Sequence, residues 1–279
     1  MPEALCPICR NSNRVEVLRL TSKRGIDFGV WRCGCCRHIW RTEPWKTSDQ
    51  ITFYEEASPT AELMETISSK NVKIFEKFLQ LADELNPHSP RRMVDFGCSC
   101  GTAMQMFKKH NWDVLGIEIL PTAQKVLDER NLPWAPSMKG SGLAPQSVDI
   151  VVMSDCIYYI ADPVEILSEI RSYLKPQGRL FLRHPTRAGA LGILLKVSKE
   201  KALSDKIWGS YIHMFSRKST ELSFKKAGFT TVKFLKEKGY DRPLKTEIVH
   251  RAIRAADFIT LGLLDLTLSW IVIAERGQC

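Results

Sequence analysis

The sequence predicts an α/β protein with a doubly wound, mostly parallel sheet, preceded by a small cysteine-rich unit. An apolar run at 93–96 ends in a glycine-containing turn, and a helical pattern begins at Thr102. A second apolar run follows at 114–117, and further strand-like runs occupy 147–153 and 179–182. Strands that alternate with helical patterns are typical of parallel sheets covered by helices on both faces.

The turn after the first of these strands carries the clearest functional signal. Asp95 precedes Gly97 and Gly101, and Glu118 ends the second strand. Glycine leaves room for a ligand to approach the backbone, amides at the helix start face that ligand, and the acid suits a ribose. A dinucleotide turn also needs a third glycine for helix–strand packing, and this chain has Thr102 there. The combination predicts cofactor binding rather than glycines kept for packing alone.

Two C-x-x-C pairs near the N-terminus predict a metal site. They occupy 6–9 and 33–36, with 23 residues between them. Each pair can place two thiolates on one side of a tight turn, and two such turns supply a tetrahedral zinc site. Cys35 and His38 are alternative candidates for the fourth ligand. The predicted ligands are Cys6, Cys9, Cys33 and Cys36.

The composition suits a globular protein of the cytoplasm. Apolar residues make up 44% of the 279 residues, and no signal-peptide pattern opens the sequence. The most apolar stretch, 258–274, has 17 residues and contains Asp265, so it falls short of a membrane span of about 20 residues. We therefore expect a cytoplasmic protein with no transmembrane segment, whose cysteines are ligands or thiols rather than disulfides.

The positive charge is unevenly distributed. The net charge is +9 overall, but it is −7 over 51–170 and +12 over 171–279. A basic face can attract phosphorylated substrates, nucleic acid or an anionic membrane, and it can equally be a solvated surface. An amphipathic pattern at 188–208 fits a lid, a docking helix or a solvent-facing helix.

Residues 95–101 resemble motif I of the class I S-adenosylmethionine-dependent methyltransferases, D-x-G-x-G-x-G, with Ser99 in place of the middle glycine. The strand at 147–153 and the helix–strand join at 225–235 are similar to later blocks of that family. Members with an N-terminal zinc ribbon also show the C-P-x-C and R-C-x-x-C pattern found here. The resemblance implies a Rossmann-like methyltransferase fold with a seven-stranded sheet, completed by a reversed strand at 270–274.

The resemblance also implies a domain division and a cofactor site. We expect a zinc ribbon at 1–45, a linker with a helix over 61–85 at 46–90, and an S-adenosylmethionine-binding methyltransferase domain at 91–279. The cofactor-binding residues that it implies are Tyr54, Asp95, Gly97, Cys98, Gly101, Glu118, Ile119, Met138 and Ser154.

Methyl transfer to a hydroxyl requires an aligned acceptor and removal of a proton. Histidine suits that role because its ordinary pKa lies near neutral pH. We predict His213 as the base, because it lies in a segment that resembles the acceptor-facing element of the family, and His184 as the second candidate. Tyr159 and Asp155 are less favoured, and Tyr158-Tyr159 stands where many relatives have Glu-His.

The expected function is S-adenosylmethionine-dependent methyl transfer to a hydroxyl of a small or sugar-like acceptor, and a phosphorylated small molecule is among the acceptors considered. An RNA base methyltransferase is the first alternative, because the basic second half suits a phosphate backbone. A non-catalytic zinc-ribbon adaptor with a decayed methyltransferase fold is the second, consistent with Ser99 and Tyr158-Tyr159.

Overall fold

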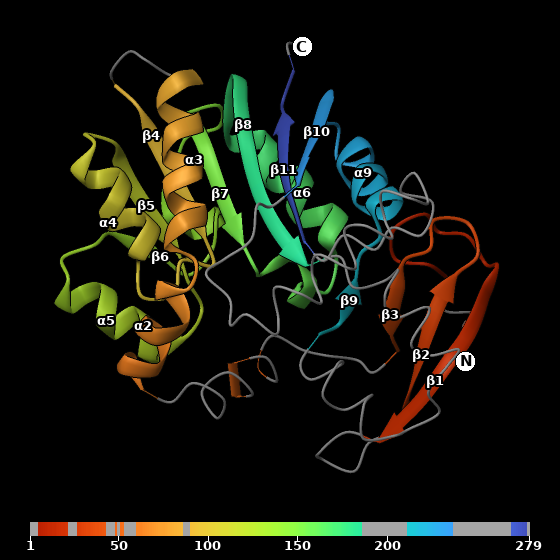
Figure 1. Ribbon diagram of the computed structural model, residues 1–279. Helices are drawn as coiled ribbons and strands as arrows, with labels where there is room; N and C mark the ends of the chain where they lie inside the picture. Colours follow the sequence, from red (N-terminus) through yellow and green to blue (C-terminus); the bar gives the residue numbers. More distant parts are fainter. Residues whose placement is uncertain are drawn as a thin grey trace.

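Two sheets form the framework of the protein, and helices surround the larger one (Figure 1). This computed structural model describes residues 5–21, 27–42, 48, 51–52, 60–85, 90–185, 211–236 and 269–277. The segment at 188–208, with its amphipathic pattern, and most of the apolar stretch at 258–274 lie outside these ranges.

The larger sheet has seven strands in the order β10-β11-β8-β7-β4-β5-β6. Strands β4, β5, β6, β7 and β8 run parallel, whereas β11 is antiparallel to both β8 and β10. This confirms the predicted doubly wound, mostly parallel sheet with a reversed last strand. The strands are β4 (Arg92–Phe96), β5 (Asp113–Ile117), β6 (Trp134–Ala135), β7 (Val148–Ser154), β8 (Leu174–Pro185), β10 (Thr231–Lys236) and β11 (Ser269–Glu275).

Helices cover both faces of this sheet. Successive residues of a strand point to opposite faces, so Ile150 and Val152 pack on one side and Val151 on the other. The first side carries α3 (Val72–Leu85), α4 (Thr102–Lys109) and α5 (Pro121–Glu129), and the second carries α6 (Pro163–Tyr173) and α9 (Arg217–Lys226).

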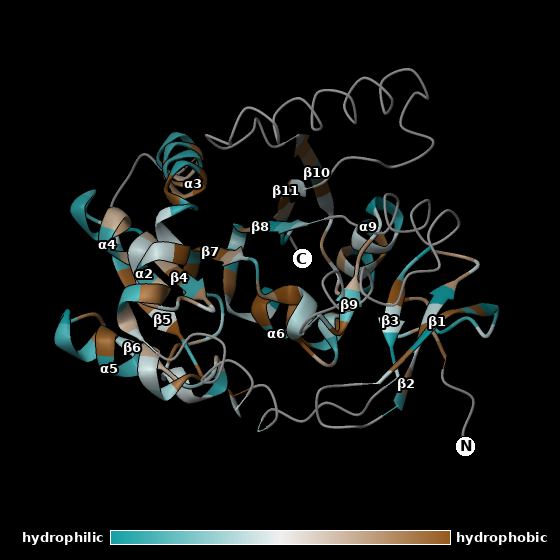
Figure 2. Ribbon diagram, turned by 60° about the horizontal axis from the view of Figure 1, so that its bottom comes forward, coloured by the Kyte–Doolittle hydropathy of each residue, from teal (hydrophilic) through white to brown (hydrophobic). Residues whose placement is uncertain are grey.

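These helices are amphipathic rather than apolar along their whole surface. Figure 2 shows hydrophilic and hydrophobic residues together on α3, which buries Ile74, Phe75, Phe78, Leu79 and Ala82. One apolar stripe against a sheet is the usual pattern of a surface helix. Among the described residues, no helix is both long enough and apolar enough to cross a membrane.

The helix expected over 61–85 is in fact two helices, α2 (Ala61–Ser69) and α3. Lys70 closes α2, because its N–H bonds to the carbonyls of Ile67 and Ser68. Asn71 then starts the next helix by accepting hydrogen bonds from two amides of α3. Ile67 is 46% exposed, because the buried side of α2 carries Met64 and Ser68 instead.

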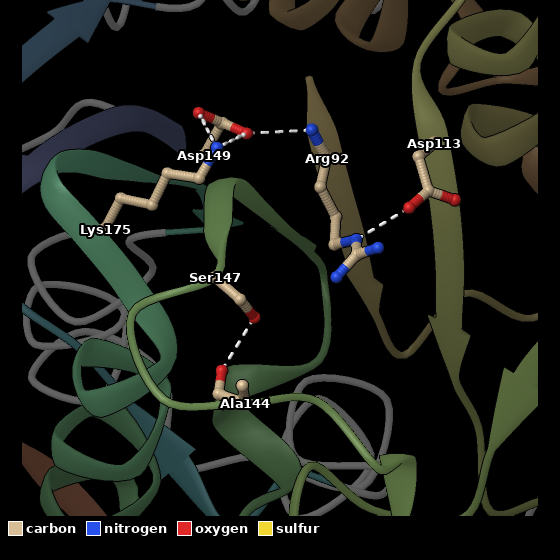
Figure 3. Close-up of polar contacts among 6 residues, drawn as sticks. All are labelled: Arg92, Asp113, Ala144, Ser147, Asp149 and Lys175. Atoms are coloured by element: carbon tan, nitrogen blue, oxygen red, sulfur yellow. Dashed lines mark hydrogen bonds and ion pairs between the residues drawn. The ribbon is translucent and has the colours of Figure 1, made fainter. Parts of the chain in front are cut away.

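Charged groups tie the strands together at the amino ends of β4, β5 and β7 (Figure 3). Lys175 Nζ donates to both carboxylate oxygens of Asp149, at 2.8 and 2.7 Å. The same carboxylate accepts the backbone N–H of Arg92 at 2.8 Å, and Arg92 Nε donates to Asp113 at 2.6 Å. These contacts fix the strands relative to one another at their amino ends. The carboxyl ends of the strands, at the opposite edge of the sheet, are free of these contacts and available for a ligand site.

The smaller sheet combines the cysteine-rich segment with a strand from far along the chain. It has the order β1-β2-β3-β9, with β9 paired antiparallel to β3. In Figure 1 these strands lie on the side of the large sheet beyond β8 and α9. Its strands are β1 (Arg14–Thr21), β2 (Asp27–Cys33), β3 (Ile39–Arg41) and β9 (His213–Met214).

Candidate functional site

The turn after β4 contains three residues with left-handed backbone angles. φ is 75° at Gly97, 49° at Ser99 and 75° at Gly101. A Cβ atom on Gly97 would lie 3.0 Å from Cβ and 3.1 Å from Sγ of Cys156. The close approach of the loop after β7 therefore excludes a side chain at Gly97, and bare backbone borders the site there.

Glu118 lies at the end of β5, and backbone amides hold its carboxylate. Ser99 N–H donates to Oε2 at 2.8 Å, while Ile119 and Leu120 donate to Oε1 at 2.7 and 2.9 Å. Glu118 is 6% exposed. Charge-assisted hydrogen bonds of this kind are stronger than neutral ones, so both oxygens have a fixed orientation.

Asp95, two residues before the turn, is also buried. Burial raises the pKa of its carboxyl to about 7, and the charge of Glu118 adds to this effect. Near neutral pH the group therefore exists in both protonation states. A cation bound nearby favours the carboxylate.

These residues open into one pocket of about 840 Å³ at the carboxyl ends of β4 to β7. Such an edge is where open α/β sheets bind ligands, and the volume is within the range for small-molecule sites. Seven of the predicted cofactor residues line it: Asp95, Gly97, Cys98, Glu118, Ile119, Met138 and Ser154.

Two predicted cofactor residues are not among the lining residues. Tyr54 lies outside the described part of the chain. Gly101 does not line the pocket. A Cβ atom there would lie 2.5 Å from Leu132 Cδ1 and 2.8 Å from Leu127 Cδ2, so this glycine is required where the start of α4 packs on α5 and on the segment after it.

Sequence reasoning missed the wall that α2 and α3 contribute. Its residues are spaced three or four apart along the chain, which places them on one side of consecutive helical turns. That spacing was a usable signal, but the large sheet had to be assembled before it could be assigned to the site. The residues are Met64, Ile67, Ser68, Asn71 and Phe75.

The wall beyond β7 is aromatic. Tyr158 and Tyr159 line the pocket, with ring centroids 4.3 Å apart. Tyr211 stacks on Tyr159 at 5.6 Å and an interplanar angle of 6°. Ser154 lines the same pocket, and its Oγ is buried and has no hydrogen-bond partner within the described residues.

The charged groups that line the pocket are all acidic. Among the described residues the lining contains no lysine, arginine or histidine. Asp155 is paired with Arg183, and Asp162 with Arg10. The acidic residues are Asp95, Glu118, Asp155, Asp162, Glu165 and Glu169.

The two histidines predicted as bases lie in the interior rather than on the pocket wall. His213 is 3% exposed and His184 is 0% exposed. Burial lowers the pKa of each to about 4. His184 bonds to Thr220 Oγ1 at 3.1 Å, and His213 bonds to His38 and to a backbone carbonyl. This placement gives the prediction of a histidine base no support.

The four predicted zinc ligands come together beside the smaller sheet, and of them Cys33 ends strand β2. Their sulfur atoms all lie within 4.8 Å of one another, with Cys6–Cys36 at 3.6 Å and Cys9–Cys33 at 3.4 Å. Tetrahedral zinc with Zn–S bonds of about 2.3 Å requires sulfur atoms about 3.8 Å apart, so the group fits a zinc ion. His38 points to His213 instead, and Cys35 is exposed.

Comparison with known proteins identifies the family. The methyltransferase domain family matches residues 68–233. An uncharacterized methyltransferase of Mycobacterium tuberculosis is 30% identical over 114 residues, which cover 39% of this chain and 46% of that protein. A ubiquinone biosynthesis O-methyltransferase of Ralstonia nicotianae is 23% identical, over 42% of this chain and 53% of that one. The chain thus matches these curated relatives over about half of their length.

Solved structures share the fold. Phosphoethanolamine N-methyltransferase 2 of Haemonchus contortus aligns with a TM-score of 0.55 and 16% identity, over 94% of this chain and 71% of that one. An S-adenosylmethionine-dependent methyltransferase of Mesorhizobium loti aligns with a TM-score of 0.52 and 16% identity, over 74% and 98%. The chain belongs to the methyltransferase domain family and has the class I, Rossmann-like methyltransferase fold.

Proposed function

We propose that the protein transfers a methyl group from S-adenosylmethionine to a small acceptor. The observation that carries the proposal is the turn after β4, where bare backbone at Gly97 and the oriented carboxylate of Glu118 face one pocket. An acid after the second strand suits the two hydroxyls of a ribose. The bound cofactor supplies a methyl group already activated by a sulfonium.

Several lining groups fit this cofactor chemically. Glu118 accepts from ribose hydroxyls, and Asp95 balances the positive charge of the amino acid end. Ser154 Oγ, which is buried without a partner among the described residues, can bond to a polar group of the ligand. Met138, which is 1% exposed and borders the pocket, supplies an apolar contact for the adenine.

For the acceptor, we propose a hydroxyl compound without a phosphate group. The described lining has six carboxyl groups, of which Asp155 and Asp162 are paired with arginines, and it has no cationic side chain, so an anionic acceptor finds no opposite charge among these lining residues. This argues against a phosphorylated acceptor and also against the phosphate backbone of RNA. The aromatic wall of Tyr158 and Tyr159 suits an acceptor that contains a ring. An amine is the second candidate for the acceptor, because carboxylates and aromatic faces attract cations.

Asp155 replaces the histidines as the side chain that we propose for the acceptor. It follows β7 directly at the carboxyl edge, lines the pocket and is held by Arg183. Its carboxylate can accept a hydrogen bond from the acceptor hydroxyl or take up its proton. Removal of that group is expected to lower turnover by about 10²–10⁴ without changing cofactor affinity.

Calorimetry with S-adenosylhomocysteine tests the cofactor assignment. The wild-type protein should bind it, and Gly97→Arg should abolish binding because the arginine side chain enters the space of Cys156. Unchanged affinity in Gly97→Arg contradicts the assignment.

A screen of hydroxyl and amine acceptors, with and without phosphate, tests the transfer, using Asp155→Asn as the matched variant. Turnover that is confined to phosphorylated acceptors contradicts the charge argument. Cofactor binding without turnover on any acceptor supports the adaptor alternative. Binding of RNA with a steep salt dependence supports the RNA alternative.

A further inference from the structure

We propose that the smaller sheet positions the pocket wall at 157–162 and that His213 is the positioning residue between them. This inference rests on the proposed function only in assigning that wall to the acceptor. Wall and sheet are far apart in the sequence, yet three separate contacts join them.

The first contact is a backbone ladder. Strand β3 pairs with β9, and Arg41 N–H donates to the carbonyl of Ile212 at 3.1 Å. Ile212 N–H in turn donates to the carbonyl of Tyr158 at 3.0 Å. The hydrogen bonds therefore run without a break from the smaller sheet into the wall, and Tyr211 adds its ring to Tyr158 at 4.5 Å.

The second contact is a pair of histidines with defined proton positions. His213 Nε2 lies 3.3 Å from the carbonyl oxygen of Ala161, and its Nδ1 lies 3.1 Å from His38 Nε2. A carbonyl oxygen only accepts, so Nε2 of His213 carries the hydrogen and Nδ1 accepts from His38. His38 Nδ1 lies 3.4 Å from Ser219 Oγ, whose hydrogen can go to this nitrogen or to the carbonyl of Ser216.

In this arrangement both ring nitrogens of His213 have hydrogen-bond partners. Its one lone pair is occupied by His38, and its one hydrogen is donated to the pocket wall. The ring is buried and neutral, which agrees with a pKa lowered by burial. His213 therefore acts on the reaction through the position of Ala161, which lines the pocket.

The third contact lies at the end of the wall. Arg10, in the loop between the first two cysteine ligands and β1, pairs with Asp162 at 3.3 Å. Asp162 also caps α6, accepting from Val164 and Glu165 at 3.1 and 3.0 Å. The pair is exposed and contributes little by itself, but it places the cysteine-rich loop beside the same wall.

The cysteine-rich loops are themselves fixed to α9. Ser216 Oγ donates to the carbonyl of Cys36 at 2.8 Å, and Lys218 Nζ donates to the carbonyl of Cys35 at 2.8 Å. Ser216 is also the N-cap of α9. The smaller sheet is thus anchored on α9 on one side and supports the wall on the other.

Amide hydrogen exchange of the full chain, read by mass spectrometry, tests the proposal. In His213→Leu, Ala161 loses its donor and His38 loses its acceptor, so peptides that cover 157–162 should exchange about tenfold faster. Peptides that cover β4 should be unchanged. His213→Gln retains an N–H donor and should restore much of the protection.

His184→Leu is the matched control. His184 is equally buried and bonds to Thr220 and to the carbonyl of Pro185, and neither partner belongs to the wall. The His184→Leu variant should therefore show the same amide exchange at 157–162 as the wild type. Equal acceleration in both leucine variants, or none in His213→Leu, overturns the proposal.

If His213→Leu does not fold, the wild-type protein supplies the test. Amide hydrogen exchange measured in low urea should show that 157–162, 211–214 and 38–41 unfold together as one cooperative unit, at a lower free energy than β4. Opening of 157–162 together with β4 overturns the proposal. Exchange needs neither cofactor nor acceptor, so this outcome is distinguishable from an absence of methyl transfer.

Discussion

The backbone amide of Ser99 donates to Glu118 Oε2 at 2.8 Å, which joins the turn after β4 to the end of β5. The two residues follow the parallel neighbouring strands β4 and β5, so this bond connects the glycine turn to the acid. Ser99 keeps a φ of 49°, a conformation that glycine adopts more easily. In this turn the serine adopts that conformation, and its amide still reaches the carboxylate of Glu118.

We predict that Glu118→Gln weakens binding of S-adenosylhomocysteine by about 10–100-fold, because an amide accepts fewer hydrogen bonds than a carboxylate and turns an NH₂ group toward backbone donors. Calorimetry measures the affinity. Glu129→Gln, an exposed change on α5, is the control and should bind as the wild type does. Equal affinity in Glu118→Gln contradicts the ribose assignment.

Ser154→Ala should change the stability of the ligand-free protein and its affinity for the cofactor in opposite directions. The buried Oγ has no partner among the described residues, so its removal should stabilise the ligand-free protein by about 1 kcal/mol. If the bound cofactor satisfies this hydroxyl, the same change should weaken S-adenosylhomocysteine. Urea unfolding and calorimetry measure the two effects. A loss of stability without loss of affinity contradicts the role in binding.

Asp95 should make stability depend on pH. Burial raises its pKa from 3.8 to about 7, so the folded protein holds this proton more tightly than the unfolded chain. Its contribution is fully present below about pH 4 and is lost as the pH rises through about 7. Asp95→Asn removes the dependence, so its melting temperature should exceed that of the wild type at pH 8 and approach it at pH 4.5. A difference in melting temperature between Asp95→Asn and the wild type that is the same at pH 4.5 and pH 8 contradicts the shifted pKa of Asp95.

The two glycines of the turn should respond differently to alanine. Gly101→Ala forces a side chain toward Leu127 and Leu132 at a left-handed φ, which should cost on the order of 2 kcal/mol of folding free energy. Because Gly101 does not line the pocket, the folded variant should keep its affinity for S-adenosylhomocysteine. Gly97→Ala should lose affinity. The reverse pattern contradicts these assignments.

Elemental analysis should find one zinc ion per chain, bound by Cys6, Cys9, Cys33 and Cys36. Cys33→Ser should release the metal and lower the melting temperature, because a small sheet with little core depends on such a site. Cys35→Ser is the control, since Cys35 is exposed and lies outside the four-sulfur group. Retention of zinc in Cys33→Ser, or its loss in Cys35→Ser, contradicts the ligand set.

Local sequence patterns predicted much of the fold and the part of the pocket formed by the glycine turn and Glu118. The strands, the turn with Gly97 and the acid at Glu118 depend on residues within about thirty positions of one another, and apolar periodicity and glycine placement report such local structure directly. The same holds for the cysteine pairs, because each pair carries its own turn. The single helix predicted over 61–85 is divided in two at Lys70 and Asn71, and no glycine or proline marks this break in the sequence.

Only the tertiary structure decided what surrounds these residues. His213 and His184 look like candidate bases in the sequence, because exposure of a side chain is invisible there. His213 is buried where β9 joins the smaller sheet, a pairing between residues about 170 positions apart, and His184 is buried in β8 with Thr220 of α9 as its partner. Gly101 likewise matches a cofactor motif but is required by Leu127 and Leu132. Long-range packing determines whether a polar side chain faces solvent, ligand or core, and so it determines which residues of a motif can reach the ligand.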